Sequence, residues 1–267
     1  MYLCRLCYTL DDRLWFPNPE SSLFLNLTIE EENLFEENKL EIPSEEELYK
    51  NLTPDDEMIA QGGDLSVERL LLAYDYGIFP WFPFRSRQIY WCAPVRRFVI
   101  FPAEIHVSHS MRTLMNKNIY RVTFNTAFDQ VIKNCSTVEG RVDEEQAWLG
   151  DEMIESYTKL HDLGRAQSVE VWRDDELVGG LYGVTSGSGF IGESMFSLEP
   201  NTSKLALISL AKKMQQEGGT LIDCQYYTPH LESMGGRYIS YKEYVTILWG
   251  AEAYKTEAEC PYVGFRD

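Results

Sequence analysis

A succession of strand and helix patterns between residues 166 and 249 constrains the fold of this chain most strongly. Residues 168–172 and 177–184 predict a β-hairpin around a polar turn at 173–175. A third strand is expected at 190–193, and residues 203–217 have the periodicity of an amphipathic helix that Gly218 ends. A strand at 220–225 and a helix at 242–249 complete the series. This order predicts an α/β (α+β) domain with a mixed sheet flanked by helices.

Polar residues interrupt two of these strands where a buried strand would normally be apolar. Glu193 lies at the end of one, and Asp223 and Gln225 lie in the other. Burying a carboxylate costs several kcal/mol unless it is paired or hydrogen-bonded. Two explanations remain open on pattern alone: the three residues carry out chemistry, or they form a buried network that fixes strand register.

The 267 residues are enough for one large domain or two smaller ones. No run of about eighteen apolar residues is present, and residues 1–5 lack the apolar core of a signal peptide. We therefore expect a soluble, cytoplasmic protein without a membrane segment. We also expect a monomer, because no helix presents an obvious unpaired apolar face.

The six cysteines are too scattered for a disulfide scaffold in a chain of this length. Cys4 and Cys7 have metal-ligand spacing, but no second pair or histidine cluster completes the four ligands of a closed zinc site. His106 and His109 are interpreted as ordinary strand or turn residues. We expect neither a metal nor a cofactor.

The formal net charge of −18 argues against a general nucleic-acid-binding protein. Thirteen of the acidic residues lie at positions 20–57, which predicts a solvated acidic insertion. The most basic part of the chain carries Arg96, Arg97, Arg112 and Lys117. These four are either ordinary surface charges or a patch that contacts the phosphates of a nucleic acid.

The N-terminal part contains a turn at 61–66 that leads into a helix ended by Gly77. Its glycines lack the lysine of a P-loop, which excludes nucleotide binding there. Residues 77–84 contain four aromatic residues and two prolines, including Trp81. This segment is either a hydrophobic plug or a platform on which a base stacks. A proline break at Pro94 predicts two domains, residues 1–94 with the acidic insertion and residues 95–267.

Seven blocks, in this order and spacing, resemble the leucyl/phenylalanyl-tRNA–protein transferases of bacteria. They lie at residues 16–19, 62–66, 77–82, 168–172, 177–184, 192–197 and 221–225. The resemblance implies a small N-terminal domain and an acetyltransferase-like (GNAT-type) C-terminal domain, which agrees with the strand pattern. It also implies an enzyme that moves leucine or phenylalanine, and less readily methionine, from its tRNA to the N-terminus of proteins beginning with Arg or Lys. The added residue marks those proteins for N-degron degradation.

The resemblance further implies roles for individual residues. Trp81 and Trp148 are expected to hold the 3′-terminal adenosine, and Phe190 and Glu193 to line the site for the adenosine and aminoacyl group. The pocket for the leucine or phenylalanine side chain is expected to include Leu181, Leu210 and Met214. Asp223 and Gln225 match the two residues that lie at the reacting amine in this family. Phosphate contacts to the acceptor stem are expected from Arg112 and Lys117, and from Arg96 or Arg97.

An aminoacyl-tRNA is already an activated ester, so the reaction requires only positioning, proton removal and stabilisation of the oxyanion. We expect Gln225 to orient the acceptor amine, Asp223 to accept or relay its proton and Glu193 to hold the aminoacyl end or the acceptor's positive charge. Cys224 is interpreted as a core residue. Three alternatives remain: an acyl-CoA-dependent N-acyltransferase, for which no good pyrophosphate-binding turn is found, a binding module with a degenerate site, and a related transferase with a different aminoacyl-tRNA.

Overall fold

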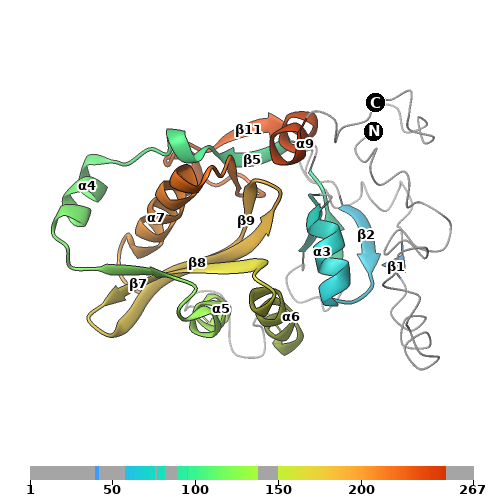
Figure 1. Cartoon of the computed structure of the whole chain (residues 1–267), viewed down its shortest axis with the longest axis horizontal. Coiled ribbons are helices and arrows are strands. Elements are labelled where there is room, and N and C mark those ends of the chain that lie inside the picture. Colours follow the sequence, from blue (N-terminus) through green and yellow to red (C-terminus); the bar gives the residue numbers. More distant parts are fainter. Residues whose placement is uncertain are drawn as a thin grey trace. The chain divides into compact units, whose positions relative to one another are not determined.

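The computed structural model describes residues 40–41, 58–75, 77–81, 89–94, 96–137 and 150–250. The chain separates into two compact units, drawn in Figure 1. Unit 1 comprises Met1–Arg96 and Ser240–Asp267, and unit 2 comprises Arg97–Ile239. The predicted boundary at Pro94 lies beside this division, whereas residues 240–267, which the sequence placed in the second domain, group with unit 1. The acidic insertion at 20–57 lies almost entirely outside the described residues.

Unit 1 contains, within its described part, a sheet with the strand order β1-β2-β4-β3 and two helices. The strands are β1 (Leu40–Glu41), β2 (Met58–Gly62), β3 (Phe79–Trp81) and β4 (Tyr90–Cys92), and the helices are α3 (Val67–Asp75) and α9 (Tyr241–Trp249). The helix predicted after the turn at 61–66 is confirmed as α3. Asp64 accepts a hydrogen bond from the backbone of Ser66 and forms an ion pair with Arg69, which fixes the start of this helix. Gly77 follows with φ of +71°.

Unit 2 is built on a mixed sheet that has seven strands among the described residues, in the order β11-β5-β10-β9-β8-β7-β6. The strands are β5 (Arg96–Ile100), β6 (Arg121–Phe124), β7 (Ala166–Arg173), β8 (Glu176–Ser186), β9 (Gly189–Ser197), β10 (Leu221–Asp223) and β11 (Arg237–Ser240). The helical segments are η2 (Pro102–Glu104), α4 (His109–Asn116), α5 (Phe128–Thr137), α6 (Asp151–Asp162), α7 (Thr202–Glu217) and α8 (Pro229–Glu232). The mixed sheet with helices is as predicted, and the acetyltransferase-like type stays a proposal.

The helices of unit 2 cover both faces of this sheet, with α7 on one face and α5 and α6 on the other (Figure 1). Successive residues of a strand point to opposite faces. On β8, Leu181 packs in the apolar cluster with α7. The next residue, Tyr182, packs edge to face against Phe128 of α5 and Tyr157 of α6. The two faces of the central strands therefore have different surroundings.

The glycines of β8 permit close approach by neighbouring side chains and backbone. A Cβ at Gly183 would lie 2.6 Å from the ring of Phe190, and one at Gly179 would lie 2.5 Å from Cβ of Thr202. Glycines within a strand are typical of places where a ligand or another backbone comes close. In the structure the close neighbours are groups of the protein itself.

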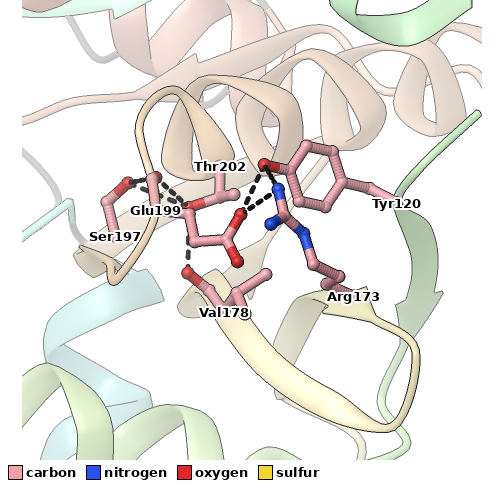
Figure 2. A network of polar contacts seen from close by, with 6 residues as sticks. All are labelled: Tyr120, Arg173, Val178, Ser197, Glu199 and Thr202. Atoms are coloured by element: carbon pink, nitrogen blue, oxygen red, sulfur yellow. Dashed lines mark hydrogen bonds and ion pairs between the residues drawn. The ribbon is translucent and has the colours of Figure 1, made fainter. Parts of the chain in front are cut away.

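A polar network joins the β7–β8 hairpin to the beginning of α7 (Figure 2). The hydroxyl of Tyr120 donates to Glu199 Oε2 at 2.6 Å, and Arg173 forms an ion pair with the same carboxylate at 2.5 Å. The guanidinium of Arg173 also lies over the Tyr120 ring. Thr202 donates to the carbonyl of Val178 at 3.0 Å. This network fixes the ends of β8 and β9 at a distance from the polar residues of their middle segments.

Candidate active site

The candidate site lies where two parallel neighbouring strands, β9 and β10, separate. They pair from Leu221 opposite Gly189 to Asp223 opposite Ile191. At Asp223 strand β10 ends, whereas β9 continues to Ser197. The carboxyl ends of parallel strands are common positions for ligand sites, because backbone and side-chain groups of both strands are left unpaired there.

Glu193 lies at an irregularity in the pairing of β8 with β9. Tyr182 is opposite Ser194, but the next residue, Gly183, is opposite Gly192, so Glu193 is an extra residue in β9. Such a bulge bends a strand and redirects a side chain. Glu193 Oε2 accepts a hydrogen bond from the Tyr157 hydroxyl at 3.1 Å. The alternation of β9 alone does not account for this orientation of Glu193.

Gln225 connects the two diverging strands. Its side-chain Nε2 donates to Glu193 Oε1 at 3.0 Å. Its backbone has a left-handed φ of +61°, which is uncommon for a residue other than glycine and marks a strained position. The backbone N–H of Gln225 donates to Asp223 Oδ1 at 2.8 Å, and this bond holds the turn. Glu193 can only accept hydrogen bonds, so the amide must direct its nitrogen to Glu193 and leave its oxygen Oε1 for another donor.

Asp223 forms a buried ion pair with Arg97. Both side chains are 0% exposed, and Arg97 Nη2 donates to Asp223 Oδ2. A pair of this kind compensates the desolvation of two charges only while both partners are present. The prediction that Arg97 contacts a tRNA phosphate is therefore wrong for this structure, because its guanidinium lies inside the protein and serves Asp223.

The three residues predicted for the aminoacyl side chain, Leu181, Leu210 and Met214, are all buried members of one apolar cluster on the α7 face of the sheet. Phe190, which was predicted to line the site for the adenosine and aminoacyl group, belongs to the same cluster. Cys224 borders the same cluster. Burial, and to a smaller degree the carboxylate of Asp223, raises the pKa of the Cys224 thiol above its ordinary value. A thiol held in its neutral form is a poor nucleophile, which agrees with its interpretation as a core residue.

The remaining predicted site residues differ in how far the structure describes them. Trp81 is in β3 of unit 1, and its side chain is 40% exposed. Trp148 lies outside the described residues. Arg96, Arg112 and Lys117 are exposed, as a phosphate contact requires. Arg112 belongs to α4, and Lys117 is the residue that caps its C-terminus.

Two residues of the site were missed by the sequence reasoning. Tyr157, which bonds to Glu193, is buried in α6 and is indistinguishable in the sequence from an ordinary core aromatic residue. The role of Arg97 was missed because its partner is 126 positions away in the sequence. A possible signal was the arginine inside an otherwise apolar strand, since a buried arginine requires an acidic partner.

Two further absences apply to the described part of the chain. It contains no group of three or more His, Cys, Asp or Glu residues arranged to hold a metal ion. It also contains no helix that is both long enough and apolar enough to cross a bilayer. Cys4 and Cys7 lie outside this part.

Comparison with known proteins matches both the N-terminal and the C-terminal part of the described chain to one family. A sequence model described as leucyl/phenylalanyl-tRNA protein transferase matches residues 99–249, and one for the N-terminal domain of that family matches residues 63–95. The leucyl/phenylalanyl-tRNA–protein transferase of Flavobacterium psychrophilum is 52% identical over 193 residues, which cover 72% of this chain and 90% of that protein. The transferase of Syntrophobacter fumaroxidans is 48% identical over 193 residues, which cover 72% of this chain and 82% of that protein.

The transferase of Escherichia coli O1:K1 is 46% identical over 191 residues, covering 72% of this chain and 80% of that protein. Among solved structures, L-PGS from Bacillus licheniformis matches with a TM-score of 0.37 and 14% identity, over 58% of this chain and 50% of that one. This structural likeness is too weak to identify a type of fold.

Proposed function

Because the chain belongs to the leucyl/phenylalanyl-tRNA–protein transferase family, as its sequence blocks predicted, we propose that it transfers leucine or phenylalanine, and less readily methionine, from tRNA to the N-terminal amine of proteins beginning with Arg or Lys. Membership makes the protein an aminoacyltransferase. The observation that carries the assignment to this site is the hydrogen bond from Gln225 to Glu193 where β9 and β10 separate.

The reaction needs one new bond and the loss of another. The nitrogen of the acceptor's α-amine attacks the carbonyl carbon of the aminoacyl ester and forms an amide. The bond from that carbon to the ribose oxygen breaks. The ribose oxygen leaves as a hydroxyl group, because it takes up a proton in exchange for the one that the nitrogen loses. Because the ester is already activated, holding the two substrates in attack geometry can supply about 7–11 kcal/mol.

We assign Gln225 to the orientation of the incoming amine. Its Nε2 is held by Glu193, so its oxygen Oε1 is directed to the partner that brings an N–H group. The left-handed turn at Gln225 fixes the position of this oxygen at the end of β10. Preorganised polar groups of this kind lose little orientation when the substrate arrives.

Asp223 acts on the amine through Gln225. One of its oxygens is occupied by Arg97 and the other by the Gln225 backbone N–H. We therefore propose that Asp223 positions Gln225 and relays the proton of the amine, and that it does not accept this proton directly. Glu193 holds the aminoacyl end of the donor, supported by the hydroxyl of Tyr157.

The other parts of the donor are assigned to separate surfaces. The leucine or phenylalanine side chain enters the apolar cluster that contains Leu181, Phe190, Leu210 and Met214. Trp81 and Trp148 stack on the terminal adenosine, and exposed Trp81 suits this role. Arg96, Arg112 and Lys117 contact phosphates of the acceptor stem.

The charge of Asp223 is paired with Arg97, so the carboxylate of Glu193 is the acidic group that suits an acceptor with a cationic first residue. The new N-terminal leucine or phenylalanine would mark this acceptor for N-degron degradation. Aminoacyl-tRNA as the donor places the reaction in the cytoplasm. A transfer assay with purified protein tests the proposal, using radiolabelled Leu-tRNA, Phe-tRNA or Met-tRNA and acceptor proteins that differ only in an N-terminal Arg, Lys or Asp. Label in acid-precipitable protein after RNase treatment, dependent on Arg or Lys, is the expected result. Transfer from acyl-CoA instead would favour the alternative donor.

A further inference from the structure

Strand β9 has an open edge in the interior of the mixed sheet of unit 2. Its first three residues, 189–191, pair with β10 and are buried. The next four, 192–195, are only partly buried, although β9 lies between two other strands in the sheet order. The change in exposure coincides with the end of β10 at Asp223. The following backbone turns to β5, where the N–H of Cys224 donates to the carbonyl of Phe98 at 2.9 Å.

The pairing of β9 with β8 determines which backbone groups point to this edge. In an antiparallel pair, residues that exchange hydrogen bonds with the partner strand alternate with residues whose N–H and C=O point away from it. The N–H of Leu198 donates to the carbonyl of Val178 at 2.8 Å, and Phe196 has the same orientation two residues earlier. Met195 and Ser197 therefore direct their N–H and C=O groups away from β8. Within the described part of the chain, no hydrogen bond reaches these groups.

The spacing of these backbone groups identifies the kind of molecule that fits the open edge. A row of alternating N–H and C=O groups along one side of a strand is complementary to another extended polypeptide. A nucleotide has no amide groups that repeat at this spacing. Glu193 and Ser197 are four residues apart along β9, a span of about 13 Å. The edge therefore has room for a short extended segment of polypeptide.

The open edge begins at the contact to which we assign the acceptor amine. Gln225 Nε2 donates to Glu193 Oε1 at 3.0 Å where β9 and β10 separate. A polypeptide whose amine lies at this contact and whose chain runs toward Ser197 is parallel to β9, as β10 is. It continues the line of β10 beyond Asp223. The direction required by the amine and the direction of the sheet thus agree.

We propose that the acceptor polypeptide binds as an added parallel strand on the open edge of β9, through the backbone groups of Met195 and Ser197. This inference rests on the proposed function, which supplies an acceptor whose N-terminal amine must reach Gln225. It adds a main-chain binding surface to the site. It also accounts for an acceptor class that is defined by its first residue, because main-chain hydrogen bonds do not distinguish the residues that follow.

Peptides with one methylated backbone nitrogen test this binding mode on the wild-type protein. The probes are a fluorescent alanine-rich peptide beginning with Arg and its derivatives N-methylated at the second, third, fourth or fifth residue. Their Kd values are measured by fluorescence anisotropy. Because only alternate N–H groups of a strand point to one neighbour, methylation should raise Kd roughly 3- to 10-fold at alternate positions and little at the positions between them. Equal effects at successive positions, or no effect at any, would overturn the proposal.

Transfer assays with the same peptides separate this binding mode from the proposed function. If the Kd values alternate but neither leucine nor phenylalanine is transferred to the unmodified peptide, the proposed function fails and the binding mode survives. If transfer occurs with the same kcat/KM for every methylated peptide, the proposed function survives. The acceptor then does not pair with β9, and the binding mode fails.

Two variants of Ser197 separate its backbone N–H from its side chain. Ser197→Pro removes the N–H that points to the open edge, and it removes no hydrogen bond between β9 and β8. Ser197→Ala is the matched control, because both variants lose the hydroxyl that donates to the Glu199 carbonyl at 2.7 Å, but alanine keeps the N–H. The proline variant should bind the unmodified peptide roughly 3- to 10-fold more weakly than the alanine variant. Equal Kd values for the two folded variants would contradict the proposal, and the methylated peptides decide it if the proline variant does not fold.

Discussion

The side-chain amide of Gln225 donates to the carboxylate of Glu193 at 3.0 Å across the point where two parallel strands separate. Three local features produce this contact. The bulge in β9 redirects Glu193, the left-handed backbone places Gln225 beyond the end of β10, and Asp223 holds the intervening turn through the Gln225 N–H. The arrangement leaves the amide oxygen of Gln225 for a substrate donor.

Breaking the buried ion pair should destabilise the protein strongly. Arg97→Met leaves Asp223 buried and charged, which typically costs about 3–5 kcal/mol. Chemical denaturation would measure the loss. The double variant Arg97→Met with Asp223→Leu should recover much of this stability and remain inactive, because the turn at Gln225 loses its acceptor. Similar stability for the single variant and the wild type would contradict the account.

The glycine in the middle of β8 should be intolerant of a side chain. In Gly183→Ala the new methyl group would overlap the Ile191 carbonyl oxygen and lie 2.6 Å from the Phe190 ring, so both the neighbouring strand and the ring must shift. We expect about 1–3 kcal/mol of destabilisation and a changed ratio of leucine to phenylalanine transfer. Gly150→Ala is the matched control, because a Cβ there meets nothing within 4 Å. Equal melting temperatures for the two variants would argue against this packing.

Alkaline conditions should expose the effect of Cys224. Burial, and then Asp223, raises the pKa of this thiol in the folded protein, whereas in the unfolded chain it titrates near about 8.5. Its contribution to stability is therefore fully present below that pH and is lost as the pH rises above it. The free energy of unfolding, measured by chemical denaturation at several pH values between 7 and 10, should fall less steeply with pH for Cys224→Ala than for the wild type. Because Cys224 is a core residue, the variant should retain transfer activity, and complete loss of transfer by a folded variant would contradict this interpretation.

Binding of tRNA should depend on salt through the exposed cations of α4. If Arg112 and Lys117 each contact a phosphate, removing one should reduce the slope of log K against log salt by about 0.9. Filter binding of Phe-tRNA across a salt series would measure the slope for Arg112→Ala, Lys117→Ala and the control Lys133→Ala on α5. An unchanged slope in both α4 variants would exclude the patch.

Much of the fold followed from local pattern. The hairpin of β7 and β8, the long helix α7 and the helix α3 were predicted because each has a clear period and an identifiable turn or glycine end. β11 was missed because its four residues carry little pattern. β9 was expected to end at Glu193, where polar residues begin, but the bulge allows it to continue to Ser197.

For the candidate site, the sequence named residues but not the contacts between them. The polar residues in buried strands indicated Glu193, Asp223 and Gln225. The positive φ of Gln225, which ends β10 two residues earlier than predicted, has no signal in an alternating sequence. Contacts between distant positions, such as Arg97 with Asp223 and Tyr157 with Glu193, depend on the folded topology. Because the contact with Asp223 is not visible in the sequence, Arg97 was wrongly assigned to the surface.

Single-turnover transfer by Gln225→Gly tests the central claim most directly. Glycine adopts the positive φ of this position without strain, so the variant removes the side chain and keeps the backbone turn. With Phe-tRNA and an acceptor peptide beginning with Arg, both saturating, we predict a rate at least about 100-fold below that of the wild type. The Tm should fall by no more than the loss of one buried hydrogen bond explains. A rate within a few-fold of the wild type would show that the Gln225 side chain does not orient the amine.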